Sequence, residues 1–130
     1  LDLFSGTGNI SYEFASRGSL GVTSIDKNKN CIDFIKKTSN NLNLDLTIIH
    51  IDAISYLEQN NSKFNLIFAD PPYDIGEQLY NKIVFLSRRN LNLNGLLIVE
   101  HNKNMNFSDL DGFSYERKYG NNMFSFFKFK

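Results

Sequence analysis

The chain of 130 residues has a single cysteine, Cys31, and only two prolines, which stand side by side. One cysteine excludes an internal disulfide and any zinc site built from clustered cysteines, and no other metal site is expected. No apolar run approaches the roughly 20 residues of a membrane span, and the sequence shows no secretory signal. These absences predict a cytoplasmic protein without a membrane partner.

The chain also lacks an excess of charge of either sign, because 14 basic and 14 acidic residues cancel to give a pI of about 6.9. No long-range positive field therefore draws it onto nucleic acid, and any such recognition has to be local or supplied elsewhere. The sequence opens on LDLF without a lead-in, so we expect an N-terminal segment to precede it. Its length favours one domain over residues 1–130, and a monomer is the default expectation.

Short apolar runs alternate with amphipathic stretches along most of the chain. This pattern predicts parallel strands joined by helices. At the end of the chain, FSYERKYG and NNMFSFFKF flank a polar turn at 120–122, which predicts an antiparallel hairpin. The expected fold is α/β, a single Rossmann-like domain with about seven strands in a mostly parallel sheet. The expected strands before the hairpin are 1–4, 21–26, 46–52, 64–70 and 95–101; the expected helices lie around 10–17, from near 28, and over 53–59 and 77–89.

Ligands of such sheets bind outside the carboxyl ends of the strands. The first expected strand is followed by the glycine loop Ser5-Gly6-Thr7-Gly8, and the next three end in Asp26, Asp52 and Asp70. A lone aspartate at a strand end can merely cap the following helix. Three in register beside a glycine loop predict a binding site.

The loop differs from those that hold a pyrophosphate. Gly6 and Gly8 permit a tight turn and close approach of a ligand, but Ser11 stands where a dinucleotide-binding loop has its third glycine. A phosphate-binding lysine is also absent. Asp2, just before the loop, would repel a phosphate and suits a positively charged group.

Two of the strand-end acids are placed to bind the parts of a nucleoside. Asp26 lies eighteen residues after Gly8, close to the spacing at which an acid reaches a ribose. Asp52 can accept a hydrogen bond from an adenine amino group. A nucleoside with a cationic tail fits this set, and S-adenosylmethionine is the common cofactor of that shape.

The segments LDLFSGTGN, SIDKN, HIDA and FADPPY, in this order, resemble the class I S-adenosylmethionine-dependent methyltransferases, and DPPY resembles those that methylate exocyclic amino groups of bases. LDLFSGTGNISYEFASRG, GLLIVEHN and YGNNMFSFF resemble the RsmD-type family, which methylates guanine N2 in small-subunit (16S) ribosomal RNA, and the similarity covers essentially the whole chain. It implies an rRNA substrate in an assembling or assembled small ribosomal subunit. The implied cofactor-binding residues are Asp2, Phe4, Ser5, Gly6, Thr7, Gly8, Asp26, Lys27, Asp52, Ala53 and Asp70; the implied catalytic residues are Asp70, Pro71, Pro72 and Tyr73.

The DPPY segment suits methylation of a base amino group, whose lone pair is delocalised into the ring. Asp70 and the carbonyl of Pro71 can accept hydrogen bonds from its two N–H groups, which aims the lone pair at a methyl carbon. Pro72 restricts the backbone so that this carbonyl keeps its direction. Tyr73 offers a flat face for the extruded base, worth roughly 1–3 kcal/mol of stacking. A turn that ends a strand would explain the prolines but not the flanking acid and aromatic.

Other polar residues receive weaker assignments. Glu100 and Asn102 end the fifth expected strand and are candidates for contact with the substrate, whereas His50 and His101 are expected to be structural. Three alternatives remain open: an adenine-N6 or cytosine-N4 methyltransferase acting on DNA or another RNA, a nicotinamide-dependent oxidoreductase, and a nucleoside-cofactor-binding domain without catalysis. The missing third glycine and the presence of DPPY count against the oxidoreductase.

Overall fold

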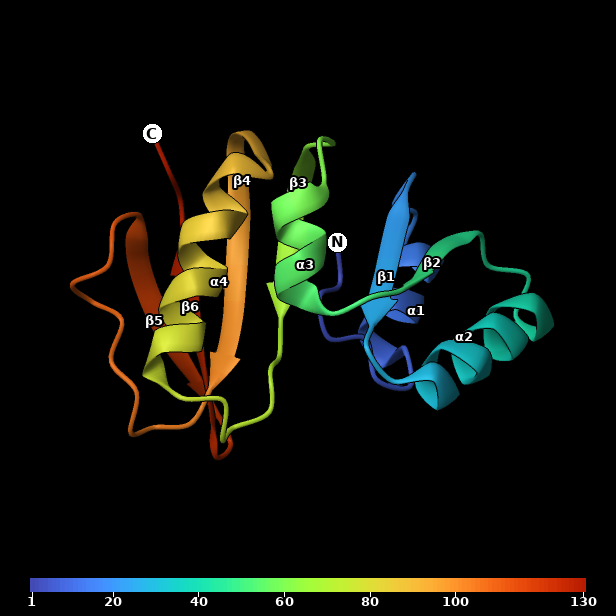
Figure 1. Ribbon diagram of the computed structural model, residues 1–130, viewed down its shortest axis with the longest axis horizontal. Coiled ribbons are helices and arrows are strands. Elements are labelled where there is room, and N and C mark those ends of the chain that lie inside the picture. The colour runs from blue at the N-terminus through green and yellow to red at the C-terminus, as the bar shows by residue number, and fades with distance from the viewer.

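The computed structural model describes all 130 residues and contains four helices and six strands (Figure 1). The four helices and the closing hairpin lie where the sequence predicts them. The helices are α1 (Asn9–Ser16), α2 (Lys29–Asn41), α3 (Ala53–Gln59) and α4 (Glu77–Arg89). The strands are β1 (Val22–Asp26), β2 (Leu46–His50), β3 (Phe64–Ala69), β4 (Leu91–His101), β5 (Phe113–Tyr119) and β6 (Asn122–Phe127).

The strands form two groups that a single residue joins into one sheet. β1 pairs in parallel with β2, while the second group has the order β3-β4-β6-β5. Asp2 forms parallel bridges to Ser24 of β1 and to Phe68 of β3. Its backbone N–H donates to the carbonyl of Thr23 at 2.8 Å, and the N–H of Leu3 donates to the carbonyl of Phe68 at 3.0 Å. The glycine loop therefore leaves the sheet at the seam between the two groups.

Two details of the expected sheet differ from the structure. The strand expected over 1–4 is wrong, because the chain turns at Leu3 and Phe4 into the glycine loop and only Asp2 bridges its neighbours. The sheet has six strands, so the count of about seven is not confirmed. β6 pairs antiparallel with both β4 and β5, so two of the four ladders are antiparallel and the sheet is mixed rather than mostly parallel.

The hydrophobic core lies between the sheet and the helices α3 and α4, which cross in front of β3 and β4 in Figure 1. Leu57 of α3, Ile83 of α4 and Leu97 of β4 are fully buried there. Full burial of such a side chain contributes about 1.5–3 kcal/mol, so this layer fixes β3 and β4 relative to each other. No helix has the length and apolar character required to cross a membrane.

Both histidines hold backbone in place near strand ends. Nδ1 of the buried His101 lies 2.8 Å from the carbonyl of Asn102, and its Nε2 lies 2.6 Å from the hydroxyl of Ser125 on β6. Burial lowers the pKa of His101, so the neutral ring donates to the carbonyl and accepts from the hydroxyl. His50 contacts the carbonyl of Lys27 at 2.9 Å. The structural roles expected for both agree with these contacts.

Candidate active site

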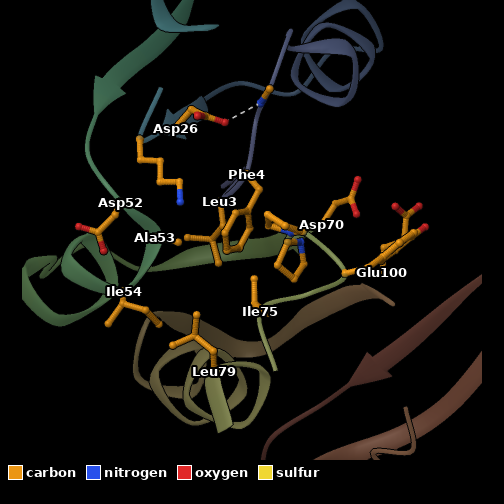
Figure 2. A pocket seen from close by; sticks show the side chains of 15 residues that line it. Leu3, Phe4, Asp26, Asp52, Ala53, Ile54, Asp70, Ile75, Leu79 and Glu100 are labelled. Carbon is orange, nitrogen blue, oxygen red and sulfur yellow. Dashed lines mark hydrogen bonds between the residues drawn. The ribbon is translucent and has the colours of Figure 1, made fainter. Parts of the chain in front are cut away.

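A pocket of about 750 Å³ opens at the carboxyl ends of β1, β3 and β4 (Figure 2). Its size falls within the usual range for small-molecule sites. The strand ends contribute its carboxylates, and α3, α4 and the segment after β3 contribute apolar side chains. The lining residues are Leu3, Phe4, Gly6, Asp26, Lys27, Asp52, Ala53, Ile54, Asp70, Pro71, Pro72, Tyr73, Ile75, Leu79 and Glu100.

The pocket collects most of the site residues predicted from the sequence. Those that line it are Phe4, Gly6, Asp26, Lys27, Asp52, Ala53, Asp70, Pro71, Pro72 and Tyr73. Four others from the first strand end do not line it: Asp2, Ser5, Thr7 and Gly8. Of these, only Thr7 is exposed, and the other three are buried at the base of the loop. A direct contact between these four and a cofactor stays a prediction.

Asp26 ties the glycine loop to the end of β1. Its Oδ2 accepts a hydrogen bond from the backbone N–H of Gly6 at 2.9 Å, drawn as a dashed line in Figure 2, and its Oδ1 accepts from the N–H of Asn28 at 2.8 Å. A carboxylate offers about four lone-pair positions, so each oxygen retains one for a ligand. Asp26 can therefore hold the loop and bind hydroxyl groups at the same time.

Gly8 is the point at which the loop becomes helix α1. Its φ of 93° lies in the left-handed region, which residues with a side chain seldom adopt. A Cβ at this position would also lie 2.5 Å from ring atoms of Tyr12. The Tyr12 hydroxyl donates to the carbonyl of Thr7 at 2.7 Å, so the ring closes over the turn. Gly8 thus shapes the loop from below the pocket.

Asp52 both caps a helix and lines the pocket. It is the N-cap of α3, and its carboxylate accepts from the N–H of Ser55 at 3.0 Å. Hydrogen bonding by the Ser55 side chain, and then by its backbone, lowers the pKa of Asp52. Asp52 is therefore an acceptor at neutral pH, next to the apolar side chains of Ala53 and Ile54.

The DPPY segment (70–73) follows β3 and forms another wall of the pocket. The ring of Tyr73 is half exposed, and its hydroxyl donates to Oδ1 of Asn122 at 2.8 Å. Asn122 opens β6 at the hairpin turn, so the closing hairpin holds the aromatic end of the segment in place. The face of Tyr73 remains available to a flat ligand.

Glu100 is a site residue that has only a weak assignment from the sequence. Ala69 pairs with Val99 in the parallel ladder of β3 and β4, so the next residues, Asp70 and Glu100, lie side by side at this end of the ladder, where Glu100 is still paired with Phe124 of β6. Burial, and then contact with the Asp70 carboxyl, raises the pKa of Glu100 to about 8. The raised pKa favours the protonated form of Glu100 at neutral pH. In the sequence, Glu100 can be found only as an acid near the end of an expected strand. Its proximity to Asp70 depends on the order of the strands in the sheet, which the sequence does not give.

Tyr80 of α4 packs beneath this carboxyl pair. The buried ring contacts Phe107 with 5.4 Å between ring centroids. Its hydroxyl has no hydrogen-bond partner. Burial, and then the negative charge of Asp70, raises the pKa of Tyr80 to about 12. The phenol is therefore neutral under all physiological conditions.

Asp2 lies in a buried polar cluster away from the pocket lining. Its Oδ2 accepts from the hydroxyl of Ser11 at 2.8 Å, and Ser11 in turn accepts from Ser24 at 2.5 Å. Its Oδ1 has no partner, although the residue is only 2% exposed. Burial raises the pKa of Asp2 from 3.8 to about 6. The charged form of Asp2 is therefore a cost to the folded state.

This cost makes the stability of the wild-type protein depend on pH. Because the folded pKa lies above the unfolded one, the contribution of Asp2 is fully present below about pH 4 and is lost as the pH rises through about 6. We expect Asp2→Asn to raise the free energy of unfolding at pH 8, relative to wild type, by about 1–3 kcal/mol more than at pH 4. Urea titrations at the two pH values measure this difference.

The exposed Asp45 provides the matched control for this measurement. Asp45→Asn removes the same charge from the surface and is expected to change the free energy of unfolding by the same amount at pH 4 and at pH 8. An equal effect of Asp2→Asn at pH 4 and pH 8 would contradict the assignment of a buried, strained charge to Asp2.

Comparison with solved structures defines the class of fold. Hypothetical protein TTHA0928 of Thermus thermophilus superposes with a TM-score of 0.85 at 21% identity, covering 98% of this chain and 72% of that one. The 16S rRNA N2 G1207 methyltransferase (RsmC) of T. thermophilus, solved with AdoMet and guanosine, superposes with a TM-score of 0.84 at 19% identity, covering 99% and 36%. The fold is that of the class I methyltransferases.

Sequence comparison defines the family. The family model described as Conserved hypothetical protein 95 matches residues 1–128. Ribosomal RNA small subunit methyltransferase D of Buchnera aphidicola subsp. Baizongia pistaciae is 34% identical over 110 residues, 82% of this chain and 55% of that protein. The protein of the same name from Haemophilus influenzae is 31% identical over 111 residues, 79% and 56%. The chain belongs to this family, the RsmD-type methyltransferases, and spans just over half the length of these two relatives.

Proposed function

We propose that the protein transfers a methyl group from S-adenosylmethionine to the exocyclic N2 amino group of a guanine in 16S ribosomal RNA. The observation that carries this proposal is that Asp26, Asp52 and the DPPY segment line one and the same pocket, so that a nucleoside cofactor and a base amino group can meet there. The names of the two RsmD relatives, and the guanosine and AdoMet bound to RsmC, support the choice of substrate and cofactor.

The charge of the pocket supports a cationic cofactor. Four carboxyl groups, those of Asp26, Asp52, Asp70 and Glu100, line it together with one lysine, Lys27. This balance suits a sulfonium and disfavours the pyrophosphate of a nicotinamide dinucleotide. S-adenosylmethionine, when bound, supplies a methyl group already activated by the positive sulfur. Residues 1–130 would act as one methyltransferase domain.

The residues of the chain divide the binding of this cofactor among them. The free lone pairs of Asp26 would accept hydrogen bonds from the ribose hydroxyls, and Asp52 would accept from the adenine amino group beside Ala53. Phe4, Gly6 and Lys27 would complete the wall on the loop side. Asp2, Ser5, Thr7 and Gly8 would contribute by holding the loop in shape, and Asp70 would border both ligands.

On the substrate side, Asp70 and the carbonyl of Pro71 would accept hydrogen bonds from the two N–H groups of the amine, with Pro72 fixing the direction of that carbonyl. Tyr73 would stack on the extruded base. As the N–C bond forms and the S–C bond breaks, the amine loses one proton, which the Asp70 carboxylate would accept. Catalysis then rests on positioning and electrostatics.

The expected partner is ribosomal RNA in an assembling or assembled small subunit, met in the cytoplasm by a monomer. The balanced charge of the chain agrees with a substrate whose shape, rather than its phosphate charge alone, directs binding.

Identification of the methylated nucleoside tests the proposed function. The protein is incubated with methyl-labelled S-adenosylmethionine and, separately, with unmodified small subunits, free rRNA and DNA, and the digested product is identified. We expect N2-methylguanosine from the subunits. Labelled N6-methyladenine or N4-methylcytosine would show that the target base is adenine or cytosine instead of guanine. Absence of label with cofactor binding intact in calorimetry would indicate a domain that binds without catalysis.

A further inference from the structure

We propose that Glu100 selects guanine by accepting a hydrogen bond from the ring N1–H next to the target amino group. This inference rests on the proposed function and deepens it, because the DPPY segment alone serves amino groups of several bases. Glu100 would contact the substrate and determine specificity, while Asp70 positions the amine.

The position of Glu100 follows from the register of the sheet. Asp70 and Glu100 follow the paired residues Ala69 and Val99, so both carboxyl groups project from the same end of neighbouring strands. Figure 2 shows them at one end of the pocket, away from Asp52 and Ile54. A base held by Asp70 through its amino group therefore presents the atoms beside that group to Glu100.

The titratable groups that face Asp70 and Glu100 supply no positive charge, so the oxygens of this pair remain hydrogen-bond acceptors. They are Asp2 at the seam of the sheet, Tyr73 from the segment after β3 and Tyr80 from α4, the last two being neutral phenols. No cation is among them. Burial and contact with the Asp70 carboxyl raise the pKa of Glu100, which favours the protonated form of Glu100. The remaining oxygens of both residues then point acceptor lone pairs at the pocket.

The Watson–Crick edges of the bases differ at the atom next to the amino group. Guanine has N1–H beside N2–H₂, so two donors stand in a row. In adenine N1 lies beside the N6 amino group, and in cytosine N3 lies beside the N4 amino group, and both ring nitrogens are acceptors. Two neighbouring carboxyl groups therefore match guanine, whereas adenine or cytosine would place an acceptor against an acceptor. Such a mismatch is an effective way to reject a wrong ligand.

The base analogue 2-aminopurine separates these contributions, because it keeps the amino group at position 2 but has an unprotonated N1. The guanine methylated in the labelling experiment is replaced by 2-aminopurine in small-subunit RNA, which is then assembled into subunits. The rate of labelling is compared between the two RNAs. Loss of one hydrogen bond to a carboxyl group predicts that the wild type prefers guanine by about tenfold to a hundredfold.

The decisive quantity is how this preference changes in variants. Glu100→Ala is expected to reduce the ratio of guanine to 2-aminopurine labelling to within about threefold of one, because neither base can then form a hydrogen bond with the side chain at position 100. Glu100→Gln, whose amide can present either its carbonyl or its NH₂, is expected to reduce the ratio as well and serves if the alanine variant folds poorly. Glu116→Ala, which removes an exposed carboxyl of β5 outside the pocket, is expected to keep the wild-type ratio.

The outcomes distinguish a failure of the role proposed for Glu100 from a failure of the proposed function. An unchanged ratio in both Glu100 variants, with N2-methylguanosine as the wild-type product, would overturn the role of Glu100 and leave the proposed function standing. A wild-type product other than N2-methylguanosine would overturn the proposed function and this inference with it. A ratio that collapses in the Glu100 variants and not in Glu116→Ala supports both.

Discussion

Replacement of Asp70 by alanine is expected to slow methyl transfer by about a hundredfold to ten thousandfold, the range typical of a lost group that handles a proton. The side chain lines the pocket together with those of Glu100 and Pro71. In the proposed mechanism, its loss would leave one N–H of the amine without an acceptor and would remove the group that takes the proton. We expect the dissociation constant for S-adenosylmethionine to stay near that of the wild type.

Single-turnover labelling and a calorimetric titration of the cofactor measure the two quantities separately. Asp74→Ala is the matched control, because Asp74 is exposed in the same loop and does not line the pocket. It is expected to leave both values near wild type. If the affinity of Asp70→Ala for the cofactor falls as far as its activity, Asp70 belongs to the cofactor rather than to the substrate.

Replacement of Asp26 by alanine is expected to weaken cofactor binding by about tenfold to a hundredfold, since charge-assisted hydrogen bonds contribute about 1.5–3 kcal/mol each. Two effects combine in this variant. The ribose hydroxyls would lose their proposed acceptor, and the N–H groups of Gly6 and Asn28 lose the carboxylate that fixes the glycine loop to β1. The dissociation constant from calorimetry measures the sum.

Asp26→Asn separates the two effects. Its amide oxygen can still accept from Gly6, so the loop keeps one anchor while the charge is lost. We expect a dissociation constant between those of the wild type and Asp26→Ala. A titration of Asp26→Ala indistinguishable from the wild type would exclude the assignment of Asp26 to the ribose.

Much of the fold could be predicted because its elements are encoded locally. The segments AISYLEQ and EQLYNKIVFLSRR coincide with α3 and α4, whose apolar positions recur with helical spacing. The prediction of a strand over residues 1–4 was wrong for a physical reason. An apolar run shows that residues are buried but not where the chain leaves the sheet, and residues 3–4 are already part of a turn.

The site could be predicted where topology alone brings residues together and not where side-chain direction or strand order decides. Asp26, Asp52 and Asp70 converge on one pocket because each lies at or just beyond the carboxyl end of a strand of the same sheet. The sequence does not encode the direction of the Asp2 side chain, which lies with Ser11 instead of in the pocket lining. The contact of Tyr73 with Asn122 joins residues 49 positions apart, so no local pattern could reveal it.

The seam at Asp2 has a consequence for cooperativity. Within the sheet, β1 and β2 meet the other four strands only through the bridges of this one residue, so separation of the two groups disrupts few backbone hydrogen bonds. Such a boundary favours subglobal opening, in which one group of strands exchanges its amide hydrogens while the other stays folded. A ligand that contacts Asp26 on one side and Asp70 on the other acts as a non-covalent cross-link across the boundary. We therefore expect cofactor binding to stabilise the closed sheet and to couple the two groups into one folding unit.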